Sequence, residues 1–131
     1  MLCLDSTFLI DFLRNNPDAV KKTAEIMDET LATTSINVFE VLFGIYARKD
    51  ASEKDLKIFE SFISNLNILP FDLNASMFAS KIGAELKHKG KDIGAVDCFI
   101  AGSMISGNCR KILTRNRGHF ERIAQLKAES Y

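Results

Sequence analysis

Short apolar runs alternate along this chain of 131 residues with longer segments of helical periodicity. The first run, residues 1–4, is followed by apolar side chains at helical spacing, namely Phe8, Leu9, Phe12 and Leu13. Strands that are separated by helices are joined by crossovers and therefore pair in parallel. The alternation predicts an α/β fold, in which a parallel sheet of four to five short strands has helices on both faces.

The expected elements are placed by their apolar patterns and by their end residues. Ser35, Ser52 and Asp72 are suited to N-cap helices, because short polar side chains accept hydrogen bonds from the first helical N–H groups. Pro17 suits the first turn of a helix. We predict strands over residues 1–4, 31–34, 67–69, 111–114 and 126–131, and helices over 8–13, 17–28, 35–48, 52–65, 75–88 and 95–106.

Composition limits the function classes that fit the chain. Apolar residues make up 47% of the sequence and charged residues 26%, which excludes a disordered chain and suits one domain over residues 1–131. The net charge is zero, so any contact with nucleic acid must come from a local patch. Residues 81–122 hold 9 basic and 4 acidic side chains, whereas residues 1–80 hold 7 and 12. A surface that binds a polyanion such as a nucleic acid is therefore expected in the C-terminal half.

The cysteines and the hydropathy pattern indicate a cellular compartment. Cys3, Cys98 and Cys109 are far apart and form no CxxC pair, which is typical of reduced thiols. No apolar run approaches the roughly 18 residues of a membrane span, and no basic segment followed by an apolar run begins the chain. These features predict a cytoplasmic protein with no membrane contact.

Three acidic residues lie where a parallel sheet binds ligands. Asp5 follows the first strand, and Asp97 begins an apolar helix, although either residue would also suit a helix N-terminus. Glu40 has the apolar neighbours Ile36 and Phe43 on its own helix face. A carboxylate is costly to bury unless it is paired or binds a metal. The alternatives for Glu40 are a solvated groove or a distant basic partner.

Carboxylates that lie close together repel one another, and a divalent cation removes that conflict. Oxygen ligands favour Mg²⁺ or Mn²⁺ over zinc, and the two histidines, His88 and His119, have no ligand-like spacing. His119 is expected at the surface or against a phosphate. Asn116, which follows the strand at 111–114, is suited either to a turn or to a neutral oxygen ligand.

Four stretches of the sequence match a known family in order. They are residues 4–11 (LDSTFLID), 34–41 (TSINVFEV), 93–101 (IGAVDCFIA) and 113–116 (LTRN), the last followed by His119 and Phe120. Together they resemble the PIN-domain nucleases and, more narrowly, the VapC-type ribonuclease toxins of prokaryotic toxin–antitoxin pairs. The resemblance implies a PIN domain with a Mg²⁺- or Mn²⁺-dependent ribonuclease site, in which a metal-activated water attacks an RNA phosphodiester.

The resemblance also assigns roles residue by residue. It implies metal ligands at Asp5, Glu40 and Asp97, with Asn116 as a fourth catalytic position where many relatives carry Asp. This departure leaves a second metal unsupported. The remaining implied roles are supporting hydroxyls at Thr7 and Thr114 and RNA contacts at Arg115, Arg117 and Lys91.

The expected partners are RNA, a small antitoxin and a second copy of the chain. Helices 36–48 and 52–65 contain the aromatic residues Phe39, Phe43, Tyr46, Phe59 and Phe62, which either pack in the core or form such an interface. Two other functions fit the sequence less well. A PIN-fold binding module without cleavage would gain nothing from three clustered carboxylates, and a phospho-accepting signalling domain requires acidic and lysine positions that this sequence does not match.

Overall fold

A five-stranded parallel sheet lies at the centre of the protein, as a computed structural model describes it for residues 1–50 and 53–131. The strand order is β3-β2-β1-β4-β5, and every neighbouring pair is parallel. This arrangement confirms the predicted α/β fold and its parallel sheet. The strands are β1 (Leu2–Leu4), β2 (Leu31–Thr34), β3 (Asn67–Leu69), β4 (Lys111–Leu113) and β5 (Lys127–Glu129).

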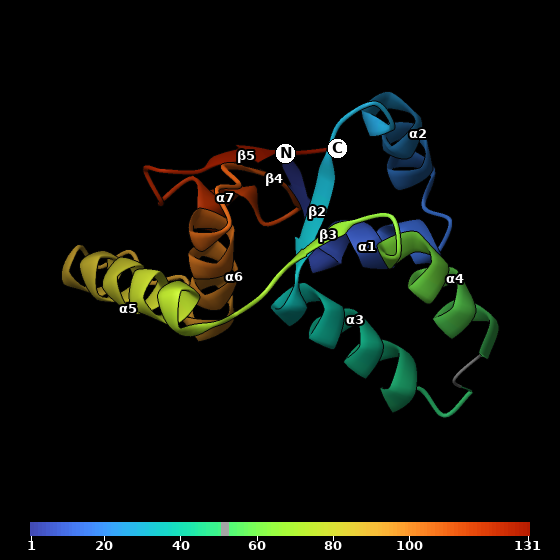
Figure 1. The fold of residues 1–131 in the computed structure, drawn as a ribbon, viewed down its shortest axis with the longest axis horizontal. Helices are drawn as coiled ribbons and strands as arrows, with labels where there is room; N and C mark the ends of the chain where they lie inside the picture. The colour runs from blue at the N-terminus through green and yellow to red at the C-terminus, as the bar shows by residue number, and fades with distance from the viewer. Residues whose placement is uncertain (51–52) are drawn as a thin grey trace.

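Helices cover both faces of the sheet. Successive side chains of β1 point to opposite faces, so they belong to two separate apolar cores. Leu2 and Leu4 pack with α1 to α4 on one face, whereas Cys3 packs with α5 and α6 on the other. Figure 1 shows α5 and α6 on one side of the sheet and α1, α2 and α4 on the opposite side. The helices are α1 (Ser6–Leu13), α2 (Pro17–Ile26), α3 (Ser35–Ala47), α4 (Glu53–Ile63), α5 (Leu73–His88), α6 (Ala95–Ser106) and α7 (Arg117–Phe120).

The register places the ends of three strands at one edge of the sheet. Cys3 of β1 pairs with Ala32 of β2 and with Ile112 of β4. The chain leaves β1, β2 and β4 at this edge and enters α1, α3 and the turn before α7. In open parallel sheets this carboxyl edge is where ligands bind. The fold therefore brings residues 5–7, 34–40 and 114–119 to one region.

The predicted element boundaries differ from the observed ones at several ends. The prediction that Ser35 caps α3 is wrong: Thr34 is the N-cap, and the hydroxyl of Ser35 accepts a hydrogen bond from the N–H of Phe71 at 3.1 Å. Helix α5 begins two residues earlier than predicted, although Asp72 does cap it. The predicted cap at Ser52 lies outside the described residues.

The cysteines are all buried, whereas the aromatic residues of α3 and α4 divide between the core and the surface. Cys3, Cys98 and Cys109 are buried and free. Phe59 belongs to the core, whereas Phe39 is 63% exposed, and Phe43 and Tyr46 are similarly exposed. Along the described residues, no helix combines the length and apolar character needed to cross a membrane.

Candidate active site

Asp5 is the most deeply buried carboxylate of the site, with 3% of its surface exposed. It is the residue before α1, but its side chain makes no capping hydrogen bond to that helix. Its Oδ1 accepts from Nδ2 of Asn37 at 2.9 Å, and its Oδ2 accepts from Oγ1 of Thr114 at 2.6 Å and of Thr7 at 3.1 Å. Asp5 is thus oriented by neutral donors from three separate elements.

Asn37 joins Asp5 to the start of α3. Its Oδ1 accepts from the N–H and the hydroxyl of Thr34, which completes a capping box at this helix. Its Nδ2 donates to Asp5 and to Oγ of Ser6, both at 2.9 Å. The amide oxygen accepts two hydrogen bonds and the amide nitrogen donates two, so every donor and acceptor of the Asn37 side chain is used. Asn37 thereby fixes the position of α3 relative to the end of β1 at the site.

Glu40 lies one turn further along α3 and is half-buried. Its Oε1 accepts from Oγ of Ser6 at 2.6 Å. Within residues 1–50 and 53–131, no Lys or Arg forms an ion pair with it, so the proposed distant basic partner is not present there. Glu40 is therefore linked to Asp5 through Ser6 and Asn37, because Nδ2 of Asn37 donates both to Oγ of Ser6 and to Oδ1 of Asp5.

Asp97 lies in the first turn of α6, and Gly94 rather than Asp97 is the N-cap residue. Its side chain is 17% exposed, and its Oδ2 lies 2.7 Å from Nδ1 of His119. His119 comes from α7 and is itself partly exposed. The contact was not anticipated from the sequence, which had placed His119 at the surface or against a phosphate.

The three carboxylates interact electrostatically. Burial raises the pKa of Asp5, the hydrogen bonds from Thr114 and Thr7 oppose this rise, and the charge of Asp97 adds to it. Burial likewise raises the pKa of Glu40, and the charges of Asp5 and Asp97 raise it further against the hydrogen bond from Ser6. The charge of Asp97 thus makes the ionisation of Asp5 harder, and the charges of Asp5 and Asp97 make that of Glu40 harder.

The chemistry of this donor set fits a hard divalent cation. All the side-chain donors to Asp5 are neutral, and all the ligand atoms are oxygens, which favour Mg²⁺ or Mn²⁺ over zinc. In the part of the chain that is described, no three His, Cys, Asp or Glu side chains are already close enough together to hold a metal ion. Asp5, Glu40 and Asp97 would have to draw together around a cation.

The remaining residues singled out from the sequence are exposed and make no side-chain contact with the three carboxylates among the described residues. Asn116 is exposed, and its side chain does not cap α7, although its N–H donates to Oγ1 of Thr114 at 2.9 Å. Arg115 forms an ion pair with Asp11, and Arg117 forms one with Glu121. The exposed Lys91 is held through its backbone, because its carbonyl accepts from Arg122. The supporting residues that the sequence analysis missed are Ser6 and Asn37; the capping-box spacing from Thr34 to Asn37 was the available signal.

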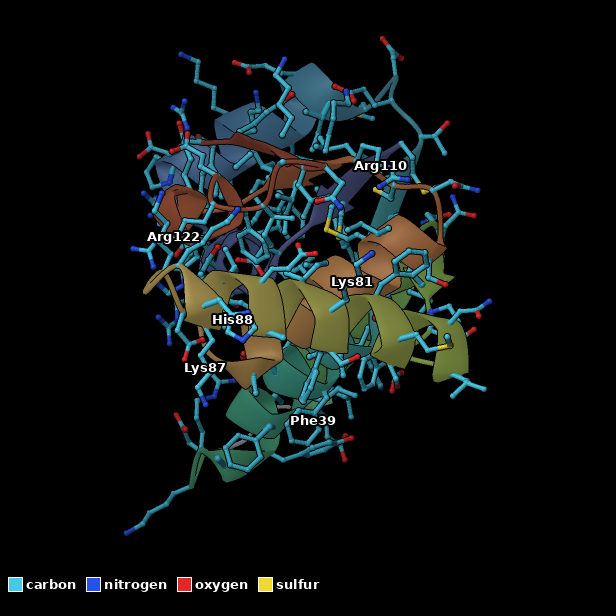
Figure 2. The ribbon with its side chains drawn as sticks, turned by 90° about the vertical axis from the view of Figure 1, so that its left-hand side faces the viewer. Phe39, Lys81, Lys87, His88, Arg110 and Arg122 are labelled. Atoms are coloured by element: carbon cyan, nitrogen blue, oxygen red, sulfur yellow. The ribbon has the colours of Figure 1, made fainter. Side chains whose placement is uncertain are left out.

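Basic side chains gather on a face next to α6. Figure 2 shows Lys81, Lys87 and His88 along α5, and Arg110 and Arg122 on the same side of the molecule. A guanidinium nitrogen of Arg122 donates to the carbonyl of Asp92 at 3.0 Å and thereby ties the loop before α6 to α7. Part of the basic excess of residues 81–122 therefore lies on the face covered by α5, while Arg110, which precedes β4, lies at the edge of the sheet opposite to the carboxylates.

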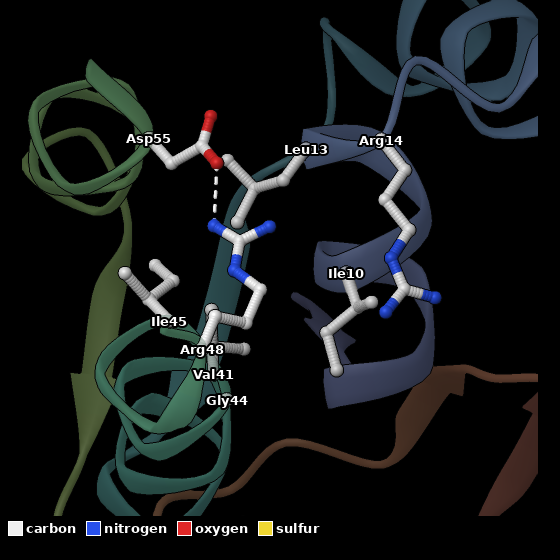
Figure 3. A pocket seen from close by; sticks show the side chains of 8 residues that line it. All are labelled: Ile10, Leu13, Arg14, Val41, Gly44, Ile45, Arg48 and Asp55. Carbon is white, nitrogen blue, oxygen red and sulfur yellow. Dashed lines mark hydrogen bonds and ion pairs between the residues drawn. The ribbon is translucent and has the colours of Figure 1, made fainter. Parts of the chain in front are cut away.

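A small cavity of about 70 Å³ lies between α1, α3 and α4, outside the carboxylate site. Figure 3 shows Arg14 and Arg48 at this cavity, with a guanidinium nitrogen of Arg48 2.6 Å from Oδ2 of Asp55. Its apolar lining comes from Ile10, Leu13, Val41, Gly44 and Ile45. None of the three acidic residues lines it, so the cavity is separate from the candidate active site.

Known proteins with similar sequences belong to the family that the motifs of this chain resemble. A sequence model of the PIN domain matches residues 2–126. The tRNA(fMet)-specific endonuclease VapC of Salmonella typhimurium is 32% identical over 129 residues, which cover 98% of this chain and 96% of that protein.

Solved structures of similar chains agree over nearly the whole length. The VapBC2 complex of Rickettsia felis, bound to a DNA fragment from its promoter, has a chain that superposes with a TM-score of 0.85 at 26% identity, covering 99% of this chain and 98% of that one. The DNA-bound VapBC of Salmonella typhimurium gives a TM-score of 0.84 at 30% identity, with 98% and 96% covered.

Proposed function

Because this chain belongs to the PIN-domain family, and within it to the VapC ribonucleases, we propose that it hydrolyses RNA at a divalent cation held by Asp5, Glu40 and Asp97. Nucleases with PIN domains generally depend on a divalent metal, and the all-oxygen ligand set favours Mg²⁺ or Mn²⁺ here. The observation that carries the assignment is the buried carboxylate of Asp5, which accepts only neutral donors and lies near two further carboxylates.

Each proposed ligand has a neighbour that orients it. Thr7, Thr114 and Asn37 fix both oxygens of Asp5, while Ser6 holds Glu40 and His119 contacts Asp97. Such outer partners set the orientation and basicity of metal ligands. A cation held by Asp5, Glu40 and Asp97 would supply Lewis-acid chemistry there, lowering the pKa of a water and stabilising negative charge on the leaving oxygen. The exposed amide of Asn116 is a weaker fourth ligand than a carboxylate, so we propose one firmly held cation.

The RNA backbone is proposed to contact basic residues at the rim of the site. Arg115 and Arg117 follow β4, and Lys91 lies in the loop that precedes α6. All three residues are exposed, and Arg115 and Arg117 follow the carboxyl end of β4, which pairs with β1. Contacts to phosphates position an RNA without reading its sequence.

The relatives indicate which RNA and which protein to test first. A relative named for its action on tRNA(fMet) is 32% identical, so we propose tRNA as the substrate class. The similar solved chains come from VapBC complexes, and we therefore propose a small antitoxin as the inhibiting partner. Self-association into a homodimer stays a prediction, for which the exposed side chains of Phe39, Phe43 and Tyr46 offer an apolar surface.

Cleavage of end-labelled initiator tRNA, measured with Mg²⁺, Mn²⁺ or excess EDTA, tests the activity. We expect cleavage with either ion, none in EDTA, and a loss of at least about a hundredfold in Asp97→Asn and Glu40→Gln. Asp28→Asn, which neutralises an exposed carboxylate away from the site, serves as the matched control. Full activity in EDTA, or undiminished cleavage by a folded Asp97→Asn variant, would contradict the proposal. Tight binding of RNA without cleavage under any divalent ion would favour the binding module instead.

A further inference from the structure

Three residues far apart in the sequence form a cluster beside the carboxylate site, and we call Asp11, Arg115 and Tyr131 the Arg115 cluster. Oδ2 of Asp11 accepts from Nε of Arg115 at 2.6 Å and from the phenol of Tyr131 at 2.7 Å. The guanidinium carbon of Arg115 also lies 4.6 Å from the centre of the Tyr131 ring. Asp11 thus holds the edge of the guanidinium through a hydrogen bond, and the ring of Tyr131 packs against its face.

The cluster is connected to Asp5 through a short hydrogen-bonded path. The backbone N–H of Arg115 donates to Oγ1 of Thr7 at 3.0 Å. The same hydroxyl lies 3.1 Å from Oδ2 of Asp5, to which it donates. The backbone of Arg115 is therefore fixed next to Asp5 at the carboxyl edge of the sheet. An RNA strand would have to pass this edge to bring a phosphodiester to Asp5.

The geometry exceeds what an ordinary surface ion pair requires. An exposed ion pair by itself contributes little to stability. Here Tyr131 is itself anchored, because its ring packs edge-on against the buried Phe8 with centroids 5.0 Å apart. The Arg115 side chain nevertheless stays 44% exposed. A guanidinium has five N–H donors; Asp11 takes the one on Nε, and the carboxylate of Asp18 lies 3.9 Å from an Nη, beyond hydrogen-bond distance. Donors therefore remain for a further anion.

The protonation of the two partners suits this arrangement. Burial alone would raise the pKa of Asp11, but the hydrogen bonds from Arg115 and Tyr131 lower it. Burial and the hydrogen bond to Asp11 raise the pKa of Tyr131. At neutral pH, Asp11 is a carboxylate and Tyr131 a neutral phenol, so the phenol can only donate to Asp11 and the carboxylate can only accept.

We propose that Asp11 and Tyr131 are positioning residues, which hold the guanidinium of Arg115 where it binds an RNA phosphate next to the bond that is cleaved. This inference rests on the proposed ribonuclease function and adds two residues to it. Tyr131 is therefore expected to affect kcat/KM only by positioning Arg115. In a variant that lacks the guanidinium, the loss of the Tyr131 hydroxyl should have no effect on kcat/KM.

A double-mutant cycle tests that statement. We expect kcat/KM for tRNA cleavage to fall about tenfold or more in Arg115→Gln and about threefold to tenfold in Tyr131→Phe, which keeps the ring and loses only the hydroxyl. In the Arg115→Gln background, Tyr131→Phe should cause no further loss. Arg110→Gln, at the opposite end of β4, is the control for the loss of one positive charge. An equal fold loss from Tyr131→Phe in both backgrounds would overturn the positioning role.

Asp11→Asn separates positioning from simple electrostatics. If Asp11 only neutralised Arg115, its removal would strengthen the attraction for RNA and raise kcat/KM. The positioning role predicts a fall in kcat/KM instead, and a rise would contradict it.

Binding measured without cleavage separates this inference from the proposed function. With a fluorescein-labelled tRNA transcript in EDTA, Arg115→Gln should weaken binding and lower the slope of log Kd against log salt by about one, whereas Arg110→Gln should leave the slope unchanged. Identical slopes for both variants overturn the inference even if the wild type cleaves RNA. A slope change in a protein that cleaves nothing overturns the proposed ribonuclease activity and leaves the phosphate contact standing.

Discussion

Asn37 donates from Nδ2 to Oδ1 of Asp5 at 2.9 Å, and this bond joins the first turn of α3 to the end of β1. The same amide accepts two hydrogen bonds from Thr34 and donates another to Ser6. It is fully buried. One neutral side chain therefore supports both the helix cap and the orientation of a proposed metal ligand.

Replacing this amide should damage stability and activity together. We expect Asn37→Ala to lower the free energy of unfolding by about 1–3 kcal/mol, because buried partners lose their hydrogen bonds, and to reduce cleavage by a fully folded sample. Urea denaturation and cleavage assays on the same preparation measure the two effects. Asn74→Ala, at an exposed position in the first turn of α5, is the control. A variant as stable and as active as Asn74→Ala would show that the network is dispensable.

The raised pKa of Asp5 predicts a stability that depends on pH in the metal-free protein. The folded carboxyl keeps its proton above the ordinary value of 3.8, at which the unfolded carboxyl ionises. The contribution of Asp5 is therefore fully present below pH 3.8 and declines as pH rises through the folded pKa. Asp5→Asn removes this decline, so the variant should become more stable relative to the wild type as pH rises from 3.8 towards 7, by at most about 1.4 kcal/mol per pH unit while only the unfolded carboxyl is ionised.

Denaturation of both proteins in EDTA between pH 3 and pH 7 measures this difference, which is also expected to reverse when a divalent ion binds only the wild type. A difference in stability that does not change with pH would show that Asp5 carries no destabilising charge in the folded state.

Much of this site was predictable because it depends on local sequence. Asp5 directly follows an apolar strand, and Glu40 lies among apolar helix residues, so each was recognisable from its neighbours. The N-cap of α3 was assigned to Ser35 instead of Thr34, since both side chains can cap. The choice depends on where β2 ends, and Thr34 still pairs with Leu69 of β3.

The contact between Asp97 and His119 was not predictable, because 22 residues separate them. It requires α6 and α7 to meet beside the sheet, which depends on the packing of Phe120 against the α6 core. Similarly, the ring of Tyr131 reaches Arg115 only because β5 pairs with β4. Neither the contact of Asp97 with His119 nor that of Arg115 with Tyr131 can be inferred from the spacing of these residues along the sequence.

His119 should strengthen cation binding through its contact with Asp97. Groups that hydrogen-bond to metal ligands typically change metal affinity by about 10–100-fold. We expect His119→Ala to raise the Mn²⁺ concentration for half-maximal cleavage by about tenfold, with the maximal rate less affected. Calorimetric titration of Mn²⁺ provides a readout without RNA. The matched control is His88→Ala, at an exposed position at the end of α5. Equal Mn²⁺ dependence in the two variants would remove His119 from the site.

Gly102 determines how closely α5 packs on α6, the helix that carries Asp97. A Cβ at this position would lie 2.4 Å from the carbonyl oxygen of Ala75 and 2.7 Å from Cβ of Ala79, so the backbone of α5 would have to move. We expect Gly102→Ala to destabilise the protein by about 1–3 kcal/mol or more, as overpacking usually does. Gly44→Ala is the matched control, because its Cβ meets nothing within 4 Å and Ala favours a helix by about 0.5–1 kcal/mol over Gly. Urea unfolding should therefore shift in opposite directions for the two variants. A Gly102→Ala protein as stable as the wild type would mean that α5 and α6 separate without loss, contrary to the tight packing of these two helices.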